Sequence, residues 1–298
     1  MKAGFVAILG KPNVGKSTLL NALIGTKVSI TSRRAQTTRD AIQGVLSERR
    51  GQIVFVDSPG VHEPTKHLGK RMMREVVRAT QGCHAVLLMV DASADPDASD
   101  ERAVAIVKRL RQPVLLLANK VDKVARKENL LPFLDRCSQW HDFDGYVPVS
   151  ATKRINLDRV LTEIFVRLPE APQYYPAGQL TDQPERFLAS EVIRERILRE
   201  THDELPYAVA VLIDRWRETR KKLRISVSVV VERNGQKAIL IGKDGQKMKQ
   251  LASKARQTLE AKFQRSVHLE VFVKVRRNWR NKRRFVEDLD FHRILGSG

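Results

Sequence analysis

A glycine-rich loop near the start of the chain limits what this sequence can fold into more than any other feature: Gly10-Lys11-Pro12-Asn13-Val14-Gly15-Lys16-Ser17. It fits G-x-x-x-x-G-K-[ST], a loop whose backbone N–H groups surround the phosphates of ATP or GTP. The apolar run 5–9 before it predicts a strand and residues 16–24 after it predict a helix, whose N-terminus adds positive charge at the loop. In this setting Lys16 reaches the β- and γ-phosphates, and the hydroxyl of Ser17 is a magnesium ligand.

A second motif, Asn119-Lys120-Val121-Asp122, predicts that the nucleotide is GTP. It follows the apolar strand 114–118, and a carboxylate at Asp122 can accept from both N1–H and the exocyclic amine of guanine, a donor pair that adenine lacks. Asn119 is placed to tie this segment to the phosphate loop. Farther on, Ser150-Ala151 follows another strand, and its backbone N–H groups are predicted to contact the guanine carbonyl. Ser150 equally suits the N-cap of the next helix.

A third motif lies between these two: Asp57-Ser58-Pro59-Gly60, at the end of the apolar strand 53–56. Asp57 is placed to hold magnesium through water, and the Gly60 N–H is placed to bond the γ-phosphate and so to sense its loss. A polar segment, 26–40, contains Gln36-Thr37-Thr38-Arg39 and supplies a further magnesium ligand. We favour Thr38 over Thr37 for that role.

These five motifs, in this order, resemble the GTPase superfamily of translation factors and Ras-like switches. The resemblance implies an α/β domain with a mostly parallel sheet and with ligands at the carboxyl ends of the strands. Apolar segments near 5–9, 42–47, 51–57, 84–91, 113–118 and 145–149 supply the strands, and helical stretches lie between most of them.

Val61 follows Gly60, where Ras-like enzymes place a glutamine that orients the attacking water. An apolar side chain cannot do this, so slow intrinsic turnover is predicted, with Lys16, Thr38 and Gly60 as the catalytic groups. Relatives with an apolar residue here often hold a potassium ion near the β- and γ-phosphates, and the resemblance implies Asn13 as one of its ligands. A hydrogen bond that stiffens the loop is the other role open to Asn13. A solvated His62 is favoured over a general base.

The length of the chain indicates more than one domain, and its charge indicates the kind of partner it binds. The 298 residues exceed one typical domain, and Cys83 and Cys137 form neither a disulfide framework nor a metal spacing. Neither a signal peptide nor a run of membrane-spanning length is recognised, so we expect a cytoplasmic protein. We also expect it to be a monomer. The net charge of +20 is concentrated: residues 220–284 hold 20 Lys or Arg against 4 Asp or Glu, a net charge of +16. Such clustering favours nucleic acid, or less often an anionic membrane surface.

Proline marks the boundary between two predicted domains. A GTPase domain spans 1–168, and four prolines in 169–184 indicate an extended linker that packs partly against a domain. A smaller α+β domain over 185–291 has the predicted order helix 185–200, strand 207–216, strand 223–232, a turn at Asn234-Gly235, short helix, glycine turn, helix 246–263 and strand 267–275.

The glycine turn of this domain lies in Ile241-Gly242-Lys243-Asp244-Gly245-Gln246-Lys247-Met248. This segment resembles the signature of the KH domain, and the order α-β-β-α-α-β is that of its bacterial type. Two glycines let the backbone clamp the phosphates of a single RNA strand, and Lys243 and Lys247 add attraction. The tail from 274 to 284 extends the basic surface with Arg276 and Arg277. There Trp279 either stacks on a base or packs on its own domain.

One GTPase domain, a proline-rich linker and one C-terminal KH domain together resemble the Era family of bacterial ribosome-assembly GTPases, over residues 4–291. The motifs predict GTP and GDP as ligands and Mg²⁺ as a cofactor, and K⁺ on Asn13 is a hypothesis. The family implies binding near the 3′ end of small-subunit (16S) rRNA coupled to small-subunit maturation. It also implies loose association with the inner membrane. The alternatives are a membrane-surface signalling GTPase that binds anionic lipid, and a non-catalytic RNA-binding protein with GTP as a structural ligand. GTP is predicted to order 26–40 and 60–82 and to strengthen RNA binding, and hydrolysis to weaken it.

Overall fold

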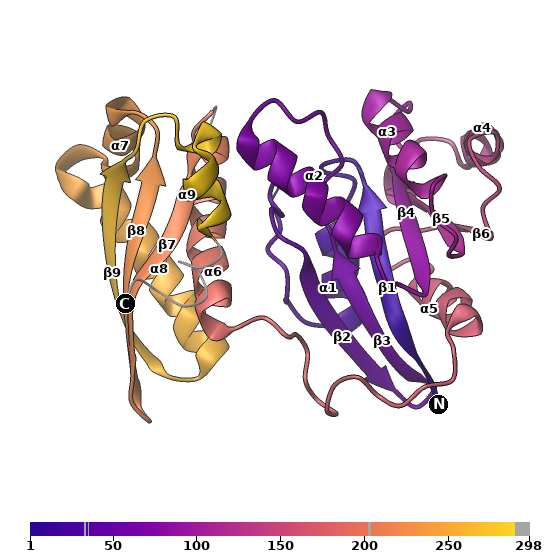
Figure 1. Cartoon of the computed structure of the whole chain (residues 1–298), viewed down its shortest axis with the longest axis horizontal. Helices are drawn as coiled ribbons and strands as arrows, with labels where there is room; N and C mark the ends of the chain where they lie inside the picture. The colour runs from indigo at the N-terminus through magenta and orange to yellow at the C-terminus, as the bar shows by residue number, and fades with distance from the viewer. Residues whose placement is uncertain (33, 35, 202–203, 290–298) are drawn as a thin grey trace. The chain divides into compact units, whose positions relative to one another are not determined.

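The computed structural model describes residues 1–32, 34, 36–201 and 204–289, and it divides the chain into two units (Figure 1). The first unit comprises Met1–Pro64 and Met72–Asp182, and the second comprises Thr65–Arg71 and Gln183–Gly298. Each has its own apolar core and is described by itself. The predicted end of the second domain at 291 lies outside the described residues. Within the described part of the chain, no helix has the length and apolar character needed to cross a membrane.

The first unit is built on a six-stranded sheet in the order β2-β3-β1-β4-β5-β6. Five strands are parallel, and only β2 runs antiparallel, against β3. This confirms the mostly parallel α/β sheet that the sequence predicts. The strands are β1 (Lys2–Gly10), β2 (Ile42–Glu48), β3 (Gly51–Asp57), β4 (Ala85–Asp91), β5 (Val114–Asn119) and β6 (Gly145–Pro148).

Helices cover both faces of this sheet because alternate strand residues point to opposite sides. In β1, Val6 and Ile8 join one core cluster while Ala7 and Leu9 join the other. The first cluster takes α1 (Lys16–Ile24) and α5 (Leu157–Arg167), and the second takes α2 (His67–Thr80), α3 (Ala98–Val107) and α4 (Leu130–Ser138). The polar residues that follow β1, β3 and β5 are thereby gathered at one edge of the sheet.

Residues 169–182, here called the strap, lie along the sheet of the first unit rather than free in solvent. Gln52, which is fully buried, holds the strap with its amide: Oε1 accepts from the Tyr174 and Tyr175 N–H groups at 2.8 and 3.0 Å, and Nε2 donates to the Tyr175 carbonyl at 2.8 Å. Farther along, the Leu180 carbonyl accepts from the Val45 N–H at 2.9 Å. The prediction that the linker packs against a domain is confirmed.

The second unit has a three-stranded sheet in the order β7-β8-β9, with β8 antiparallel to β7 and parallel to β9. Its helices α6 and α8 and the strands share one apolar core. The predicted order α-β-β-α-α-β is confirmed by α6 (Glu185–Glu200), β7 (Ala210–Glu218), β8 (Lys222–Val231), α7 (Asn234–Ile241), α8 (Gln246–Phe263) and β9 (Ser266–Val275), which α9 (Arg283–Glu287) follows.

Two local predictions for the second unit are wrong. The strand predicted from 207 begins at Ala210, because Leu205–Ala208 forms a 3₁₀ turn with a proline at its start. Asn234-Gly235 is the first part of α7 and not a separate turn. The side chain of Gln236 accepts from the N–H groups of Glu232 and Arg233 at 2.9 and 3.1 Å and so caps the helix, which begins at the asparagine.

Candidate functional site

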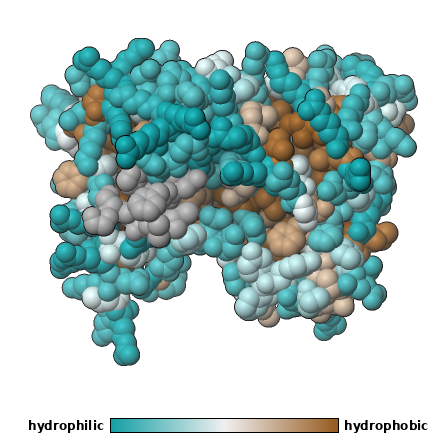
Figure 2. Space-filling model, viewed as in Figure 1, coloured by the Kyte–Doolittle hydropathy of each residue, from teal (hydrophilic) through white to brown (hydrophobic). Residues whose placement is uncertain are grey.

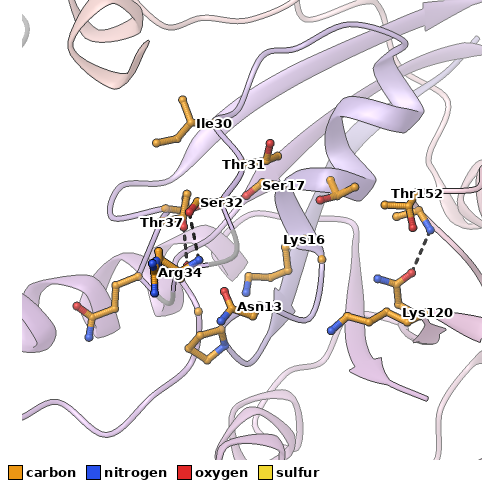
Figure 3. Close-up of a pocket in the computed structure, with 18 of the residues that line it drawn as sticks. Asn13, Lys16, Ser17, Ile30, Thr31, Ser32, Arg34, Thr37, Lys120 and Thr152 are labelled. Atoms are coloured by element: carbon orange, nitrogen blue, oxygen red, sulfur yellow. Dashed lines mark hydrogen bonds between the residues drawn. The ribbon is translucent and has the colours of Figure 1, made fainter. Parts of the chain in front are cut away.

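A cavity of about 520 Å³ opens at the glycine-rich loop of the first unit (Figure 3). This volume is within the range of small-molecule sites. Half of the predicted nucleotide-binding residues line it: Pro12, Asn13, Gly15, Lys16, Ser17, Thr38, Gly60, Asn119, Lys120 and Ala151. The other predicted residues are not part of this lining, and one of them, Asp122, is exposed: Gly10, Lys11, Val14, Asp57, Ser58, Pro59, Val61, Val121, Asp122 and Ser150. Segment 30–38 contributes more of the lining than the sequence predicts, with Ile30, Thr31, Ser32, Arg34, Gln36 and Thr37.

Lys16 is a buried ammonium at the floor of the cavity. Its Nζ donates to the carbonyls of Gly10 and Lys11, both at 3.0 Å. Burial lowers the pKa of Lys16 to about 8, while the Asp57 carboxylate acts in the opposite direction. Gly15 caps α1 without a side-chain acceptor, so the first N–H groups of that helix are open to an anion. The loop therefore presents donors and a cation where a polyphosphate would lie.

Hydroxyl groups and a carboxylate converge beside Lys16. The Ser17 Oγ donates to Asp57 Oδ2 at 2.6 Å and lies 2.9 Å from Thr38 Oγ1. Ser29, which the sequence analysis missed, donates to the same carboxylate oxygen at 3.0 Å. Thr37 instead donates to the Arg34 carbonyl at 2.7 Å, so the geometry favours Thr38 over Thr37 as the metal-side threonine.

The Asp57 carboxylate is fully buried, and its Oδ1 has no hydrogen-bond partner among the described residues. Burial raises the pKa of Asp57, whereas the hydrogen bonds from Ser17 and the charge of Lys16 act to lower it. A hard cation that takes oxygen ligands would satisfy this orphaned oxygen together with the hydroxyls of Ser17 and Thr38. The donor set fits Mg²⁺.

The segment after β3 passes close to the glycine-rich loop. A Cβ added to Gly60 would lie 2.8 Å from the Pro12 backbone, so glycine is required there. Val61 is fully buried in the core, and its N–H donates to the Gly10 carbonyl at 3.0 Å. That Val61 cannot orient water stays a prediction, and the burial of its apolar side chain is consistent with it. Ser58 is also buried and donates to the Ile8 carbonyl at 2.7 Å, which anchors the segment to β1.

Asn119 links three parts of the site. Its Nδ2 donates to the Val14 carbonyl at 2.7 Å and its Oδ1 accepts from the Ala151 N–H at 3.1 Å, which confirms the predicted tie to the phosphate loop. The Ser150 hydroxyl donates to Asp122 Oδ1 at 2.5 Å, while the Ser150 N–H donates to the Ile155 carbonyl. Contact of the Ser150 and Ala151 N–H groups with guanine stays a prediction, because both have protein acceptors here.

Two ion pairs that the sequence analysis missed hold lysines of the site. Lys120 Nζ lies 2.5 Å from Asp91 Oδ2, and Lys11 Nζ lies 2.6 Å from Asp100 Oδ2. Although burial acts to raise the pKa of Asp91, the hydrogen bond from Lys120 holds it below its usual range. The signal for Asp91 was its place at the end of β4, beside Asn119 at the end of β5.

The glycine turn of the second unit has the backbone that its sequence predicts. Gly242 has φ 72°, and a Cβ there would lie 2.6 Å from the Lys247 Cβ. The turn then leads through the exposed Lys243 and Asp244 to α8, whose first N–H groups have no side-chain cap. Ile241 ends α7 immediately before the turn. Backbone donors and lysine charge are thus placed together, as a phosphate clamp requires.

Trp279 is not available to a base, which corrects one of the two predictions made for it. Its side chain is fully buried, its Nε1 donates to the Ala208 carbonyl at 2.9 Å, and its ring packs edge-on against Phe285. Arg276 is exposed and lies over the same phenylalanine ring, at 4.1 Å, and Arg277 is exposed. The tryptophan is part of the core that supports the basic tail.

Known protein families match the sequences of both units. The family model described as 50S ribosome-binding GTPase matches residues 5–120, and a KH domain model matches residues 204–280. The GTPase Era of Staphylococcus epidermidis is 41% identical over 291 residues, which cover 97% of this chain and 97% of that protein. The GTPase Era of Heliobacterium modesticaldum is 44% identical over 283 residues, covering 95% of this chain and 94% of that protein.

Two solved structures are similar over nearly the whole chain. A variant of Aquifex aeolicus Era bound to GDP and AlF₄⁻ has a TM-score of 0.92 and 40% identity, covering 96% of this chain and 98% of that one. An Era complex with MgGDPNP and nucleotides 1506–1542 of 16S ribosomal RNA has a TM-score of 0.93 and 40% identity, with the same coverage. The phosphate loop, the guanine motif, the KH turn and these full-length similarities lead to one conclusion: the chain belongs to the Era family of GTPases.

Proposed function

We propose that this GTPase is a ribosome-assembly factor that binds the 3′ region of 16S rRNA through its KH turn and couples its GTP state to maturation of the small subunit. The observation that supports it most is that Lys16, Ser17, Thr38 and Asn119 line one cavity, with the Ser17 hydroxyl bonded to the Asp57 carboxylate. An RNA-binding protein that used GTP only as a structural ligand would not need that oxygen cluster. The relative solved with a 16S rRNA fragment supports the choice of RNA.

In this proposal the residues of the cavity bind the triphosphate and stabilise the charge that develops during transfer. The Lys16 ammonium lies against the β- and γ-phosphate oxygens, and the α1 N-terminus adds its N–H groups. The Gly60 N–H donates to the γ-phosphate. Mg²⁺, when bound, neutralises charge on the phosphates next to Ser17, Thr38 and Asp57. Since Val61 is buried, intrinsic turnover is slow.

Potassium would add positive charge near the β- and γ-phosphates, since Val61 stands where Ras-like enzymes place a glutamine. Asn13 is exposed on the cavity wall, and its side chain makes no hydrogen bond among the described residues, so its amide oxygen is open to a ligand. We expect replacement of K⁺ by Na⁺ to slow steady-state GTP hydrolysis by about tenfold or more. Asn13→Ala should hydrolyse GTP equally slowly in both salts. Equal turnover of the wild-type protein in K⁺ and Na⁺ would remove potassium from the proposal.

Guanine selection by Asp122 is tested by changing the base rather than the phosphates. An amide at this position donates a hydrogen bond where the carboxylate accepts one, so Asp122→Asn should lose GTP and gain xanthosine triphosphate, whose C2 carries a carbonyl. The exchange of one buried hydrogen-bond pair corresponds to about tenfold or more in each direction. Binding of fluorescent GDP and XDP measures it. Unchanged preference for GTP would place the base elsewhere.

RNA binding is tested by fluorescence anisotropy with a labelled RNA that matches the 3′ end of 16S rRNA. Gly242→Asp should abolish binding because a side chain at φ 72° would strain the turn and its charge would repel phosphate. The matched control is Lys16→Ala, which should lose nucleotide and keep RNA. Steady-state hydrolysis with and without the RNA then measures coupling. Equal RNA affinity with a GTP analogue and with GDP would refute the coupling.

The proposed function also implies a cellular location and an oligomeric state. A protein that matures small subunits acts in the cytoplasm, and we propose that it does so as a monomer with loose, charge-driven attachment to the inner membrane. Flotation with vesicles of anionic lipid, read as a function of salt, tests that attachment. Analytical ultracentrifugation of the nucleotide-bound chain tests the monomer.

A further inference from the structure

A buried serine of segment 26–40, Ser29, contacts the carboxylate that faces the proposed magnesium site. Figure 2 shows that hydrophilic residues predominate on the visible face of the molecule, but Ser29 and Asp57 are only 1% and 0% exposed. The Ser29 hydroxyl donates to Asp57 Oδ2 at 3.0 Å, and the Ser17 hydroxyl donates to the same oxygen at 2.6 Å. These two donors thus share one carboxylate oxygen, while Oδ1 has no partner among the described residues.

The backbone of Ser29 is held on both sides by one side chain of α1. Asn21 Oδ1 accepts from the Val28 and Ser29 N–H groups at 2.9 and 3.0 Å, and Asn21 Nδ2 donates to the Ser29 carbonyl at 2.8 Å. Val28 is itself buried in the core that α1 shares with the sheet. The position of the Ser29 hydroxyl is therefore set by α1 and by the core, and not by the polar segment that follows.

The same helix supplies the hydroxyl on the metal side. Ser17 is in the first turn of α1 and Asn21 is four residues later, so their side chains are neighbours on one face of the helix. Asp57 is the last residue of β3, whose buried residues pack in the same core as α1. One helix and one strand thereby fix Ser17, Ser29 and Asp57 relative to one another.

Thr38 reaches this group by a different route. It belongs to the stretch 30–38 that lines the cavity, whereas Ser29 is not part of the lining. The contact of Thr38 is expected to depend on the γ-phosphate, because that stretch closes on the ligand. The contact of Ser29 needs no ligand, since Asn21 already holds it. The ordered part of segment 26–40 therefore extends at least to Ser29 before GTP binds.

We propose that Ser29 is a positioning residue for Mg²⁺: its hydroxyl holds Oδ2 of Asp57, which leaves Oδ1 free for the cation or for water bound to it, and Asn21 holds Ser29 in turn. The inference rests on the proposed function, which places Mg²⁺ beside Ser17, Thr38 and Asp57. Carboxylates at metal sites are oriented by hydrogen bonds of this kind, and loss of such a partner typically weakens metal binding by about 10- to 100-fold. Ser29 should act with GDP as well as with GTP.

The test measures metal affinity on the full-length protein, with Mn²⁺ as the probe because it takes the same oxygen ligands as Mg²⁺. The EPR signal of free Mn²⁺ is followed during a titration in which the protein is in excess over nucleotide. Ser29→Ala should weaken Mn²⁺ binding by about tenfold or more, both with GDP and with a non-hydrolysable GTP analogue. Thr38→Ala should weaken it with the analogue only. Asn21→Ala should have the effect of Ser29→Ala, and the double variant should be no weaker than Ser29→Ala, because Asn21 acts through Ser29.

The matched control is Thr80→Val, which removes another buried hydroxyl of the first unit, a donor to the Val77 carbonyl at 2.7 Å. Thr80→Val and Ser29→Ala should both lower the urea midpoint of unfolding, but only Ser29→Ala should lose Mn²⁺ affinity. Equal or tighter Mn²⁺ binding by Ser29→Ala or by Asn21→Ala would make the contact purely structural and overturn the proposal. A loss confined to the GTP analogue would overturn it as well.

Asp57→Ala separates this inference from the proposed function on which it rests. If Asp57→Ala loses Mn²⁺ while Ser29→Ala keeps it, the metal site is correct and only the role of Ser29 is wrong. If Asp57→Ala binds Mn²⁺ normally, the metal lies elsewhere and the proposed site fails together with the inference.

Discussion

Changing Lys16 to methionine should stabilise the nucleotide-free protein, although it removes a group that would bind phosphate. The Lys16 ammonium is buried, and its pKa is about 8 rather than 10.5. At about 1.4 kcal/mol per unit, holding this charge in the folded chain near pH 7 costs about 3 kcal/mol. Methionine has a similar length and no charge, and the Gly10 carbonyl keeps the Val61 N–H as a donor. We expect K16M to raise the free energy of unfolding by about 2–3 kcal/mol.

The pH dependence identifies the cause of that gain. Because the folded-state pKa of Lys16 is below the unfolded one, the unfolded chain binds this proton more tightly. The wild type then gains about 1.4 kcal/mol per pH unit between about pH 8 and pH 10.5. K16M lacks this titration. Its advantage should be complete below about pH 8 and should shrink to about 1 kcal/mol near pH 9.5.

Urea unfolding of the full chain, stripped of nucleotide, measures both quantities. The transition of the first unit is the one that added GDP moves in the wild type. Lys11→Met is the matched control: burial acts to lower the pKa of Lys11, but Asp100 and Asp97 raise it above its ordinary value. K11M would leave Asp100 buried without its cation and should destabilise by about 1–3 kcal/mol. A K16M protein less stable than the wild type near pH 7, or an advantage that does not fall with pH, would refute the reasoning.

Four further predictions follow from single contacts. GTP binding near pH 8.5 should take up to about one proton, because polyphosphate restores the charge of Lys16; calorimetry in two buffers of different ionisation enthalpy counts it. Trp279→Phe should lower the free energy of unfolding of the second unit by about 1 kcal/mol, through one lost hydrogen bond, and leave RNA affinity unchanged in anisotropy. Asp91→Asn should weaken binding of fluorescent GDP about tenfold by releasing Lys120, and unchanged affinity would make that ion pair purely structural. Gln52→Leu should speed chymotryptic cleavage of the strap, because its backbone loses the three hydrogen bonds to the side-chain amide.

The sequence predictions that were confirmed rest on short-range patterns of residues. The phosphate loop, the aspartate that ends β3 and the motif that begins at the end of β5 each combine special residues with an apolar strand, so their meeting at one sheet edge follows from parallel topology alone. In the second unit, glycine spacing and element order were enough. The helix after the glycine turn has the predicted bounds, 246–263.

The features that could not be predicted from the sequence depend on contacts between residues far apart in the chain. Trp279 stands in a run of arginines, and nothing local shows that the Ala208 carbonyl, 71 residues earlier, accepts from its indole. Ser29 is one hydroxyl in a polar segment, and only the fold brings it to Asp57. Gln52 sits in an apolar strand without marking any motif. Its role depends on a strap more than 120 residues later.

The strap determines where this protein can be divided. β2 is an edge strand, and an uncovered edge offers N–H and C=O groups to another copy of the chain. Residues 180 and 181 occupy that edge, since Leu180 accepts from the Val45 N–H and the Thr181 hydroxyl donates to the Gln43 carbonyl at 2.6 Å. A GTPase fragment that stops at 168 would expose the edge and self-associate in solution. One that continues to Asp182 keeps it closed and should stay monodisperse.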